Sequence, residues 1–338
     1  MSNRKKANAA TLRVLIRSDA SPTIGVGHIM RDLVLADALR NGGCEVAFAS
    51  LEIPEHLAAK VGDAGYALHR LASGDAGELV GLLARLESDW VVFDHYGIDA
   101  DFEAEVRSAL PLRVLAFDDT YRPHDCDILL NHGIQARASR YRGLVPEGAR
   151  VLCGSAYTLV RPAFLARYSR RNASKRIERI LVTMGGTDVK NLSLAAVRYL
   201  KRLLRPLSAT VVTTSANPNL SRLCRARYAL GYRLVVDTER MPELMAAHDL
   251  VITAGGGTLF ELLAARKLFV TLSVASNQDD MVAWLKRHGI RATLHGLDYR
   301  RLHDALHDVS NNRRTLLRQM AKIRFGTGRI ASVMKEIS

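Results

Sequence analysis

The sequence has no long hydrophobic run. In its 338 residues, no uninterrupted apolar stretch reaches the roughly 20 residues that a helix needs to cross a bilayer. The start, MSNRKKANAATLRVL, is positively charged but lacks the apolar segment and small-residue cleavage site of a secretory signal. We therefore expect a cytoplasmic protein without a membrane span, in which residues 1–10 form a basic tail.

Cysteines are few and none forms a close pair. Neither a metal-binding knuckle nor a redox motif can be formed from their spacing. With no secretory signal, this pattern indicates a reducing compartment in which the thiols serve in packing. The four are Cys44, Cys126, Cys153 and Cys224.

Aromatic residues make up only 6% of the chain and do not alternate with basic residues as in stacking platforms for single strands. The formal net charge is +14, which nucleic acid could neutralise. However, the arginines are spread along the whole chain, and no zinc finger or RNA-binding aromatic signature is present. A positive field would equally attract a diphosphate. We predict a small anionic substrate and no nucleic acid; a basic nucleic-acid-binding protein is the less favoured alternative.

The hydrophobic fraction of 48% and the charged fraction of 24% are ordinary for a soluble globular protein. Short β-branched runs alternate with segments of helical periodicity, and this alternation predicts parallel sheets with crossover connections. In the first half, strands are predicted at 12–17, 44–50, 89–97, 112–119 and 127–133, and helices at 28–41 and after Pro54. The fold class is therefore α/β, of the doubly wound type.

The pattern lapses over residues 134–175, which we interpret as a connector with little room for a core strand. A second strand–helix series of similar size follows from residue 177. We therefore predict two Rossmann-like doubly wound domains facing across a ligand-binding cleft. Their expected limits are 1–160 and 161–315, with a last helix over 316–338 that packs back on the linker or the first domain.

A glycine-rich loop, SPTIGVGH, follows the first predicted strand. Gly25 and Gly27 let the backbone approach a ligand and leave the amides of the next helix facing it. His28 stands at the start of that helix between Asp19 and Arg31, and histidine is the side chain best suited to accept a proton near neutral pH. A histidine that only caps or packs the helix is the alternative. The position at the carboxyl end of a strand favours a catalytic base, with Asp19 and Arg31 near the substrate.

The motif DHYGID ends another predicted strand at the same edge of the sheet. Asp94 and Asp99 offer carboxylates to orient a base, and Tyr96 offers a phenol to hold water or substrate. Asp118 and Asp119 follow the next strand; such a pair can bind metal but is as often a polar strand end. No spacing of metal ligands is recognisable among the histidines near these acids, and we predict no metal and no cofactor. These histidines are His95, His124 and His132.

Two glycine-rich turns between a strand and a helix occur in the second half, MGGTD and TAGGGTLFE. Their amides and hydroxyls could meet a phosphate at a helix N-terminus. Glu261 falls one turn into the second helix, where it could hold a ribose diol. The predicted binding residues of the two turns are Gly185, Gly186, Thr187, Gly255, Gly256, Gly257 and Thr258. Asn277 and Gln278, at another strand end, suit sugar hydroxyl or acetamido groups; Asn277 could alternatively be a helix N-cap.

These motifs resemble one family, the UDP-sugar hydrolases of bacterial pseudaminic acid biosynthesis. The resemblance is carried in order, from about residue 12 to 295, by IGVGHIMRDLVLA, FDHYGID, FDD, CDILLN, MGGTDVKNLS, TSANPNL and the glycine run ending at Glu261 with SNQ. It implies a fold of the glycosyltransferase B (GT-B) superfamily, which includes the undecaprenyl-linked muropeptide GlcNAc transferase. It also implies removal of UDP from UDP-2,4-diacetamido-2,4,6-trideoxy-β-L-altropyranose by sugar–oxygen cleavage with inversion, without a metal.

The resemblance implies roles for individual residues. His28 matches the residue that activates water, and Tyr96 matches one that helps hold this water. Gly25 and Gly27 match the loop around the diphosphate. The residues named in the two glycine turns, with Glu261, match the nucleotide-binding half, and Asn277 and Gln278 match its amides. The segment 237–245 matches a stretch where backbone groups meet the uracil. The run AGGGTL departs from relatives that have serines there, and Thr258 stands as the replacement hydroxyl.

Residues and resemblance together predict a nucleotide-sugar hydrolase in which His28 takes a proton from water opposite the departing UDP. A single base suffices because UDP is a good leaving group. The alternative is a GT-B glycosyltransferase that uses a UDP-amino-sugar donor, with an acceptor hydroxyl in place of water. The sequence leaves open the oligomeric state, the carboxylate that orients His28, and the sugar's stereochemistry from the residues alone.

Overall fold

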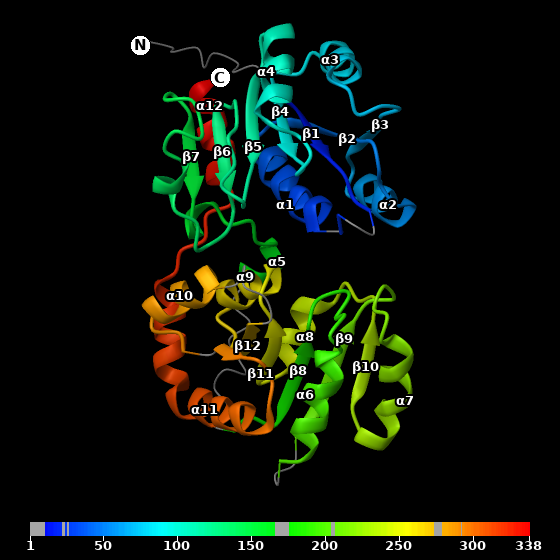
Figure 1. Ribbon diagram of the computed structural model, residues 1–338, viewed down its shortest axis with the longest axis vertical. Coiled ribbons are helices and arrows are strands. Elements are labelled where there is room, and N and C mark those ends of the chain that lie inside the picture. Colours follow the sequence, from blue (N-terminus) through cyan, green and yellow to red (C-terminus); the bar gives the residue numbers. More distant parts are fainter. Residues whose placement is uncertain are drawn as a thin grey trace, which may run out of the picture. The chain divides into compact units, whose positions relative to one another are not determined.

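The computed structural model describes residues 11–21, 24–25, 27–165, 176–203, 207–273, 279–291 and 293–338 (Figure 1). The chain divides into two compact units. Unit 1 comprises Met1–Leu159 together with Phe325–Ser338, and unit 2 comprises Val160–Arg324. Each unit is a single parallel sheet covered by helices, so the predicted fold of two doubly wound Rossmann-like domains is confirmed.

The sheet of unit 1 has seven parallel strands in the order β3-β2-β1-β4-β5-β6-β7. The strands are β1 (Arg13–Ser18), β2 (Glu45–Ser50), β3 (Ala67–Arg70), β4 (Trp90–Asp94), β5 (Arg113–Phe117), β6 (Ile128–Asn131) and β7 (Arg150–Cys153). The helices are α1 (Gly27–Asn41), α2 (Glu55–Asp63), α3 (Ala76–Arg85), α4 (Ala100–Ala109) and α12 (Arg329–Ile337), with 3-10 turns η1 (Ala138–Tyr141) and η2 (Ser155–Tyr157).

Alternate residues of the central strands of unit 1 face two different hydrophobic cores. Val14 and Ile16 pack with α1, α2 and α12, whereas Leu15 packs with α3 and α4. On β4, Trp90 and Val92 belong to the core of the α1 face. Because side chains alternate along a strand, the next residue of that series, Asp94, also points toward α1.

Two predictions about chain organisation were wrong. The segment 134–175 is not only a connector, because it contains β7, whose Leu152 is buried and pairs with Leu130 of β6. The strand is only four residues long, begins with an arginine and lies at the sheet edge, so its apolar pattern is weak.

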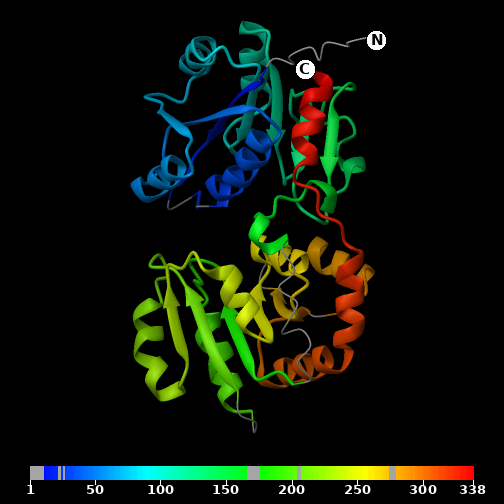
Figure 2. The ribbon, with the colours of Figure 1, turned by 180° about the vertical axis from the view of Figure 1, so that it is seen from behind.

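The predicted last helix over 316–338 is also two helices. The helix α11 ends at Lys322, and α12 begins at Arg329, after a segment with glycines at 326 and 328. Glycine disfavours a continuous helix. The helix α12 belongs to unit 1, and in Figure 2 it is the red helix that ends at the C-terminus. Its Ile330 and Met334 belong to the same hydrophobic core as residues of α1.

The sheet of unit 2 has six parallel strands in the order β10-β9-β8-β11-β12-β13. The strands are β8 (Arg179–Thr183), β9 (Ser208–Thr213), β10 (Arg233–Val236), β11 (Leu250–Ala254), β12 (Phe269–Ser273) and β13 (Thr293–His295). The helices are α5 (Pro162–Leu165), α6 (Leu192–Lys201), α7 (Leu220–Leu230), α8 (Met241–Ala247), α9 (Gly257–Ala264), α10 (Asp279–Arg287) and α11 (Tyr299–Lys322).

Both sheets reverse their strand order once, between β1 and β4 in unit 1 and between β8 and β11 in unit 2. At such a switch point the connections leave toward opposite faces of the sheet, and a crevice opens at the carboxyl ends of the two strands. The motifs singled out in the sequence follow these four strands. Within the described residues, none of the helices is both long and apolar enough to cross a bilayer.

Candidate functional site

The site in unit 1 lies at its switch point, where β1 leads into the glycine loop and β4 ends in Asp94. The loop turns at Gly25, whose φ of 85° is in the region that favours glycine, and its amide bonds to the carbonyl of Ser21 at 2.7 Å. The helix α1 then begins at Gly27, so His28 lies in its first turn. An added Cβ would meet nothing at Gly25 or Gly27, so the loop is open to close approach.

His28 forms a buried pair with Asp94. Its Nδ1 lies 2.7 Å from Asp94 Oδ1, and the two residues are only 5% and 1% exposed. Burial alone would raise the pKa of Asp94, but the charge and hydrogen bonds of Arg31, with the bond from His28, hold this pKa well below its usual range. A carboxylate can only accept, so Nδ1 carries the proton and Nε2 is left as the basic nitrogen. Among the described residues, no hydrogen bond reaches Nε2.

Arg31 clamps Asp94 from the same helix, three residues beyond His28. Its Nε donates to Asp94 Oδ2 at 2.6 Å and its Nη2 donates to Asp94 Oδ1. Its guanidinium also lies over the ring of Phe117 and 3.7 Å from Asp119 Oδ2. Such a bidentate pair fixes the carboxylate in one orientation. In the structure the partner of Arg31 is Asp94. A contact between Arg31 and the substrate stays a prediction.

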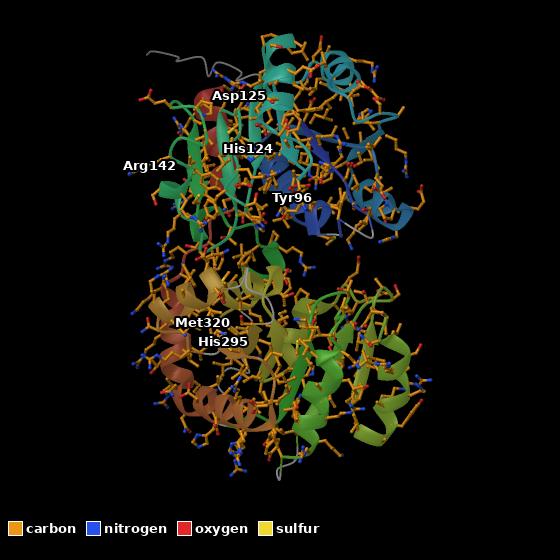
Figure 3. The ribbon with its side chains drawn as sticks, viewed as in Figure 1. Tyr96, His124, Asp125, Arg142, His295 and Met320 are labelled. Carbon is orange, nitrogen blue, oxygen red and sulfur yellow. The ribbon has the colours of Figure 1, made fainter. Side chains whose placement is uncertain are left out.

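Tyr96 covers the outer side of the imidazole. Its ring packs edge-on against His28 at 4.9 Å between centroids, and 46% of the residue is exposed. Tyr96 is labelled among the side chains of unit 1 in Figure 3. Its hydroxyl donates to Asp119 at 3.0 Å, and Arg122 donates to its carbonyl at 2.6 Å. Burial and the Asp119 charge raise the pKa of Tyr96 to about 12. The phenol therefore stays neutral and can orient a water molecule but not deprotonate it.

Asp99, the other carboxylate predicted to orient the base, does not do so. Its side chain accepts from the amide of Phe102 at 3.0 Å and caps α4. Asp99 does not contact His28 among the described residues, and a catalytic role for it stays a prediction. Of the two carboxylates that could orient His28, Asp94 is the one that contacts its imidazole.

Asp19, predicted to contact substrate, is buried below the glycine loop. It accepts from Arg17 and from the amide of Leu51 at 2.8 Å, and its Oδ2 lies 3.5 Å from His95 Nε2. These bonds join the segments that follow β1 and β2. The residue thus anchors the loop that carries Gly25, and its contact with substrate remains a prediction.

The sequence did not single out two residues of this site. Asp32, one turn beyond His28 on α1, is fully buried beside Asp94. His132, which follows β6, has Nε2 3.3 Å from Arg31 Nη1, and burial together with the Arg31 charge lowers its pKa to about 3. For Asp32 the available signal was its helical spacing of four from His28; for His132 it was its place at the end of the predicted strand 127–133.

A second buried ionic cluster lies behind the site. His124 Nδ1 is 2.7 Å from Glu103 on α4, and its Nε2 is 3.9 Å from Asp118. Asp118 also accepts from the Tyr141 hydroxyl at 2.9 Å and from the amide of Thr120 at 2.9 Å. Asp118 thus shapes the turn that carries Asp119. These hydrogen bonds fit the polar strand-end role that the sequence left open.

In unit 2 the first glycine turn follows β8. Gly185 has a φ of 83°, and it lies with Gly186 and Thr187 on the surface of the turn. Asp188 caps α6 by accepting from the amides of Leu192 and Ser193 at 2.8 and 2.9 Å. The turn therefore presents backbone and a hydroxyl to solvent beside a capped helix start.

The second glycine turn follows β11 and opens α9. Gly256 has a φ of 131°, which only glycine adopts readily, and an added Cβ would meet nothing there or at Gly257. Gly255 lies at the end of β11, with its amide 3.4 Å from the carbonyl of Leu272, and Thr258 lies in the first turn of α9. The start of α9 therefore leaves room for a ligand to approach its backbone closely.

Glu261 has a partner that the sequence did not predict. Arg161 donates to its Oε1 from Nε at 2.8 Å and from Nη2 at 2.7 Å. Burial raises the pKa of Glu261, and the Arg161 charge opposes this rise. Both contacts use Oε1, so Oε2 faces no other donor among the described residues. Glu261 can still accept from a diol.

Asn277 and Gln278 lie outside the described residues, so their predicted contacts stay predictions.

The segment expected near uracil contains the turn after β10, where Asp237 has a φ of 49° and accepts from the amide of Ser215 at 3.0 Å. Among the described residues, no cluster of three or more His, Cys, Asp or Glu side chains could hold a metal ion.

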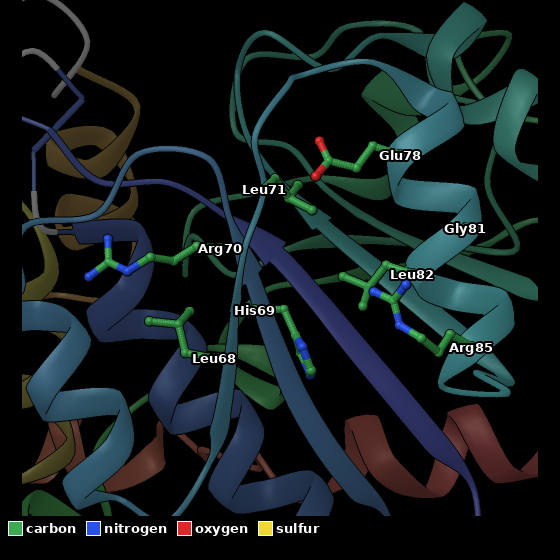
Figure 4. A pocket seen from close by; sticks show the side chains of 8 residues that line it. All are labelled: Leu68, His69, Arg70, Leu71, Glu78, Gly81, Leu82 and Arg85. Atoms are coloured by element: carbon green, nitrogen blue, oxygen red, sulfur yellow. The ribbon is translucent and has the colours of Figure 1, made fainter.

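A separate pocket of about 510 Å³ lies in unit 1 between β3 and α3 (Figure 4). Its lining includes His69 and Arg70 of β3 and Glu78 and Arg85 of α3. None of these residues was predicted for the site. The Glu78 carboxylate already accepts hydrogen bonds from the amides of Ala72 and Ser73 in the loop before α3.

The chain is similar to proteins of known activity and structure. It is 35% identical over 279 residues to the UDP-2,4-diacetamido-2,4,6-trideoxy-β-L-altropyranose hydrolase of Campylobacter jejuni, covering 82% of this chain and 97% of that protein. No family model matches the chain.

Two solved structures have the same fold at low identity. One is MurG of Acinetobacter baumannii, with a TM-score of 0.66, 15% identity, and 97% and 100% of the two chains covered. The other is a UDP-glucosyltransferase from Polygonum tinctorium, with a TM-score of 0.67, 11% identity, and 98% and 99% covered. These likenesses show a GT-B fold.

Proposed function

This chain belongs to the family of the UDP-2,4-diacetamido-2,4,6-trideoxy-β-L-altropyranose hydrolase, and we propose that it hydrolyses this UDP-sugar to UDP and the free sugar. Family membership supports the substrate class. The chemistry rests on one observation in unit 1: a buried histidine whose Nδ1 is held by an ionised aspartate and whose Nε2 is free to accept a proton. The same reaction belongs to pseudaminic acid biosynthesis, as the resemblance implies.

His28 is the base in this proposal. Its Nε2 takes a proton from water while the water oxygen forms a bond to the anomeric carbon. The bond between that carbon and the UDP oxygen breaks, and its electron pair leaves with UDP. Because water attacks opposite the leaving group, the anomeric configuration inverts. Asp94 keeps the imidazole in the reactive tautomer and stabilises the imidazolium that forms, and Tyr96 orients the water.

Unit 2 binds the nucleotide in this proposal. The amides at the start of α9 and in the turn after β8 meet the diphosphate, and their donors strengthen as the leaving group gains charge. Glu261 Oε2 accepts from the ribose. Gly25 and Gly27 in unit 1 leave room for the diphosphate, and Asn277 and Gln278 contact the sugar. No metal takes part, because the amides and UDP itself supply the leaving-group stabilisation.

The direct test is hydrolysis of the UDP-sugar in ¹⁸O-labelled water, followed by mass spectrometry of both products and early NMR spectra of the sugar. We expect the label in the sugar and none in UDP, with an initial product anomer opposite to that of the substrate. Label in UDP would mean phosphorus–oxygen cleavage and would overturn the mechanism. Turnover that requires an added acceptor would instead indicate a glycosyltransferase.

A further inference from the structure

Asp32 is a buried acid to which the proposed reaction assigns no task. It lies on α1 with 0% exposure. Within the described residues, neither carboxyl oxygen has a hydrogen-bond partner, and the hydroxyl of Ser18 also lacks one. Buried polar groups are nearly always hydrogen-bonded, and an unpaired buried charge is far costlier. The position therefore requires an explanation.

The surroundings of Asp32 are set by three elements. On α1 it follows Arg31 and lies four residues after His28, so the three side chains share one face of the helix. Below it, Ser18 at the end of β1 and Asp94 at the end of β4 are register partners in the sheet. Asp94, Arg31 and Ser18 are the groups that act on its carboxyl, with Asp94 opposing its ionisation and Arg31 favouring it.

The charges around Asp32 do not accommodate a second carboxylate beside that of Asp94. Arg31 supplies one buried positive charge, and its Nε and Nη2 are already on Asp94. His132 is kept neutral by burial, which lowers its pKa to about 3. Asp119, the remaining nearby charge, is itself negative and lies at the rim. Two adjacent carboxylates that share one cation do not both ionise in a buried site.

We propose that Asp32 is a neutral carboxylic acid in the resting protein and is a positioning residue for the Asp94–His28 pair. Its O–H donates to the Asp94 carboxylate. Burial and the Asp94 charge, which raise the pKa of Asp32 well above its usual value, agree with this assignment. The proton thus gives the buried carboxyl a hydrogen-bond partner without adding a negative charge.

The catalytic consequence rests on the proposed function. A neutral Asp32 supports Asp94 while leaving only one negative charge beside the imidazole. An ionised Asp32 would place a second negative charge next to His28 and favour its protonated form, which is no base. The neutral acid therefore keeps Nε2 available for the proton of water.

The first test needs no substrate. Infrared spectra of the free protein near neutral pH should contain the carbonyl band of a protonated carboxylic acid, which an ionised carboxylate lacks. We expect Asp32→Asn to remove this band. Asp37→Asn is the matched control, because Asp37 lies on the same helix but its side chain is half-exposed and accepts from Arg40 and Tyr66; it should leave the band in place. A spectrum without the band, or a band that survives Asp32→Asn, would overturn the protonation state.

The second test is kinetic. We expect Asp32→Ala to lower kcat about 100-fold, the scale of a small misplacement of the catalytic groups. Asparagine keeps a neutral donor and acceptor, so Asp32→Asn should recover to within about tenfold of the unaltered protein, roughly the worth of one hydrogen bond. The low-pH limb of its kcat/KM profile should stay in place. A shift of that limb by about one pH unit or more would mean that a negative charge had been removed, and would contradict a neutral Asp32.

The two tests separate this inference from the proposed function. If the protein turned over no UDP-sugar but the infrared band responded as expected, the proposed function would fail and the neutral acid would stand. If turnover occurred and Asp32→Asn were no more active than Asp32→Ala, the positioning role would fail alone. Should Asp32→Ala not fold, the spectrum and the pH profile of Asp32→Asn still decide the question.

Discussion

At the scale of single residues, His28 and Asp94 form a buried pair where the glycine loop leads into α1. His28 stood out because it follows a glycine loop at a strand end. Its partner was left between Asp94 and Asp99, because the choice depends on which face of β4 lies under α1. Strand alternation alone does not show which face of β4 lies under α1, because this depends on the side of the sheet to which the connection between the strands crosses. Asp32 was missed because an acid on an apolar helix gives no motif.

The ribose role of Glu261 can be separated from its pairing with Arg161. We expect Glu261→Ala to raise the dissociation constant of UDP roughly 10- to 100-fold, the worth of a hydrogen bond to a charged group. Isothermal titration measures this change. As a control, the binding of UMP and of uracil should be measured with the same variant. If Glu261 contacts the ribose, the affinity for uracil should change least, because uracil has no ribose. Lower thermal stability with unchanged UDP affinity would mean that Glu261 serves only to hold Arg161.

At the scale of secondary-structure elements, most strands and helices could be predicted from periodicity. Both sheets and the positions of the two glycine turns followed from the alternation of β-branched runs and helical segments. The strand β7 did not, because four residues at a sheet edge carry too little pattern. The turn after β5 was equally hard to predict, since its shape depends on a cluster joining α4, η1 and β5 through His124.

The His124 cluster predicts a pH-dependent stability for unit 1. Burial opposes the charged form, but the hydrogen bond that His124 donates to Glu103 and the negative charge of the nearby Asp118 prevail and raise the pKa of His124 from 6.5 to about 9. Its folded pKa exceeds the unfolded value, so its contribution is complete below about pH 6.5 and is lost as pH rises through about 9. We expect unit 1 to unfold at lower urea concentration at pH 9.5 than at pH 6.

The two tryptophans make this measurable, since Trp90 lies in unit 1 and Trp284 in unit 2. In a Trp284→Phe background, fluorescence reports unit 1 alone. In the same background, His124→Gln should unfold more readily at pH 6 and lose most of the difference between the two pH values. An equal pH difference with and without His124 would contradict the assignment.

At the scale of the whole molecule, the sequence predicted the fold class and a last helix that packs back on the linker or the first domain, but not the break between α11 and α12. The last residues, 325–338, belong to the unit that begins the chain. Periodicity does not identify the residues that α12 contacts, because these lie about 300 positions earlier in the chain. Met334 shows the contact most plainly: it is fully buried in the core formed with α1.

A substitution in α12 should therefore destabilise unit 1. We expect Met334→Ala to lower the free energy of unfolding of unit 1 by about 2–5 kcal/mol, the range for a buried methionine replaced by alanine. Urea unfolding followed by Trp90 fluorescence measures it. Ser332→Ala, exposed on the same helix, is the control and should change little. Equal effects of the two substitutions would mean that α12 is not part of the unit 1 core.

The central claim is that His28 is the base that activates water, and His28→Asn tests it most directly. Single-turnover hydrolysis of the UDP-sugar and titration with UDP should be measured on the same preparation. We expect the hydrolysis rate to fall by about 10²- to 10⁴-fold, the usual contribution of a general base, while the dissociation constant of UDP stays within a factor of about two. A variant that hydrolyses at a rate close to that of the unaltered protein would contradict the account.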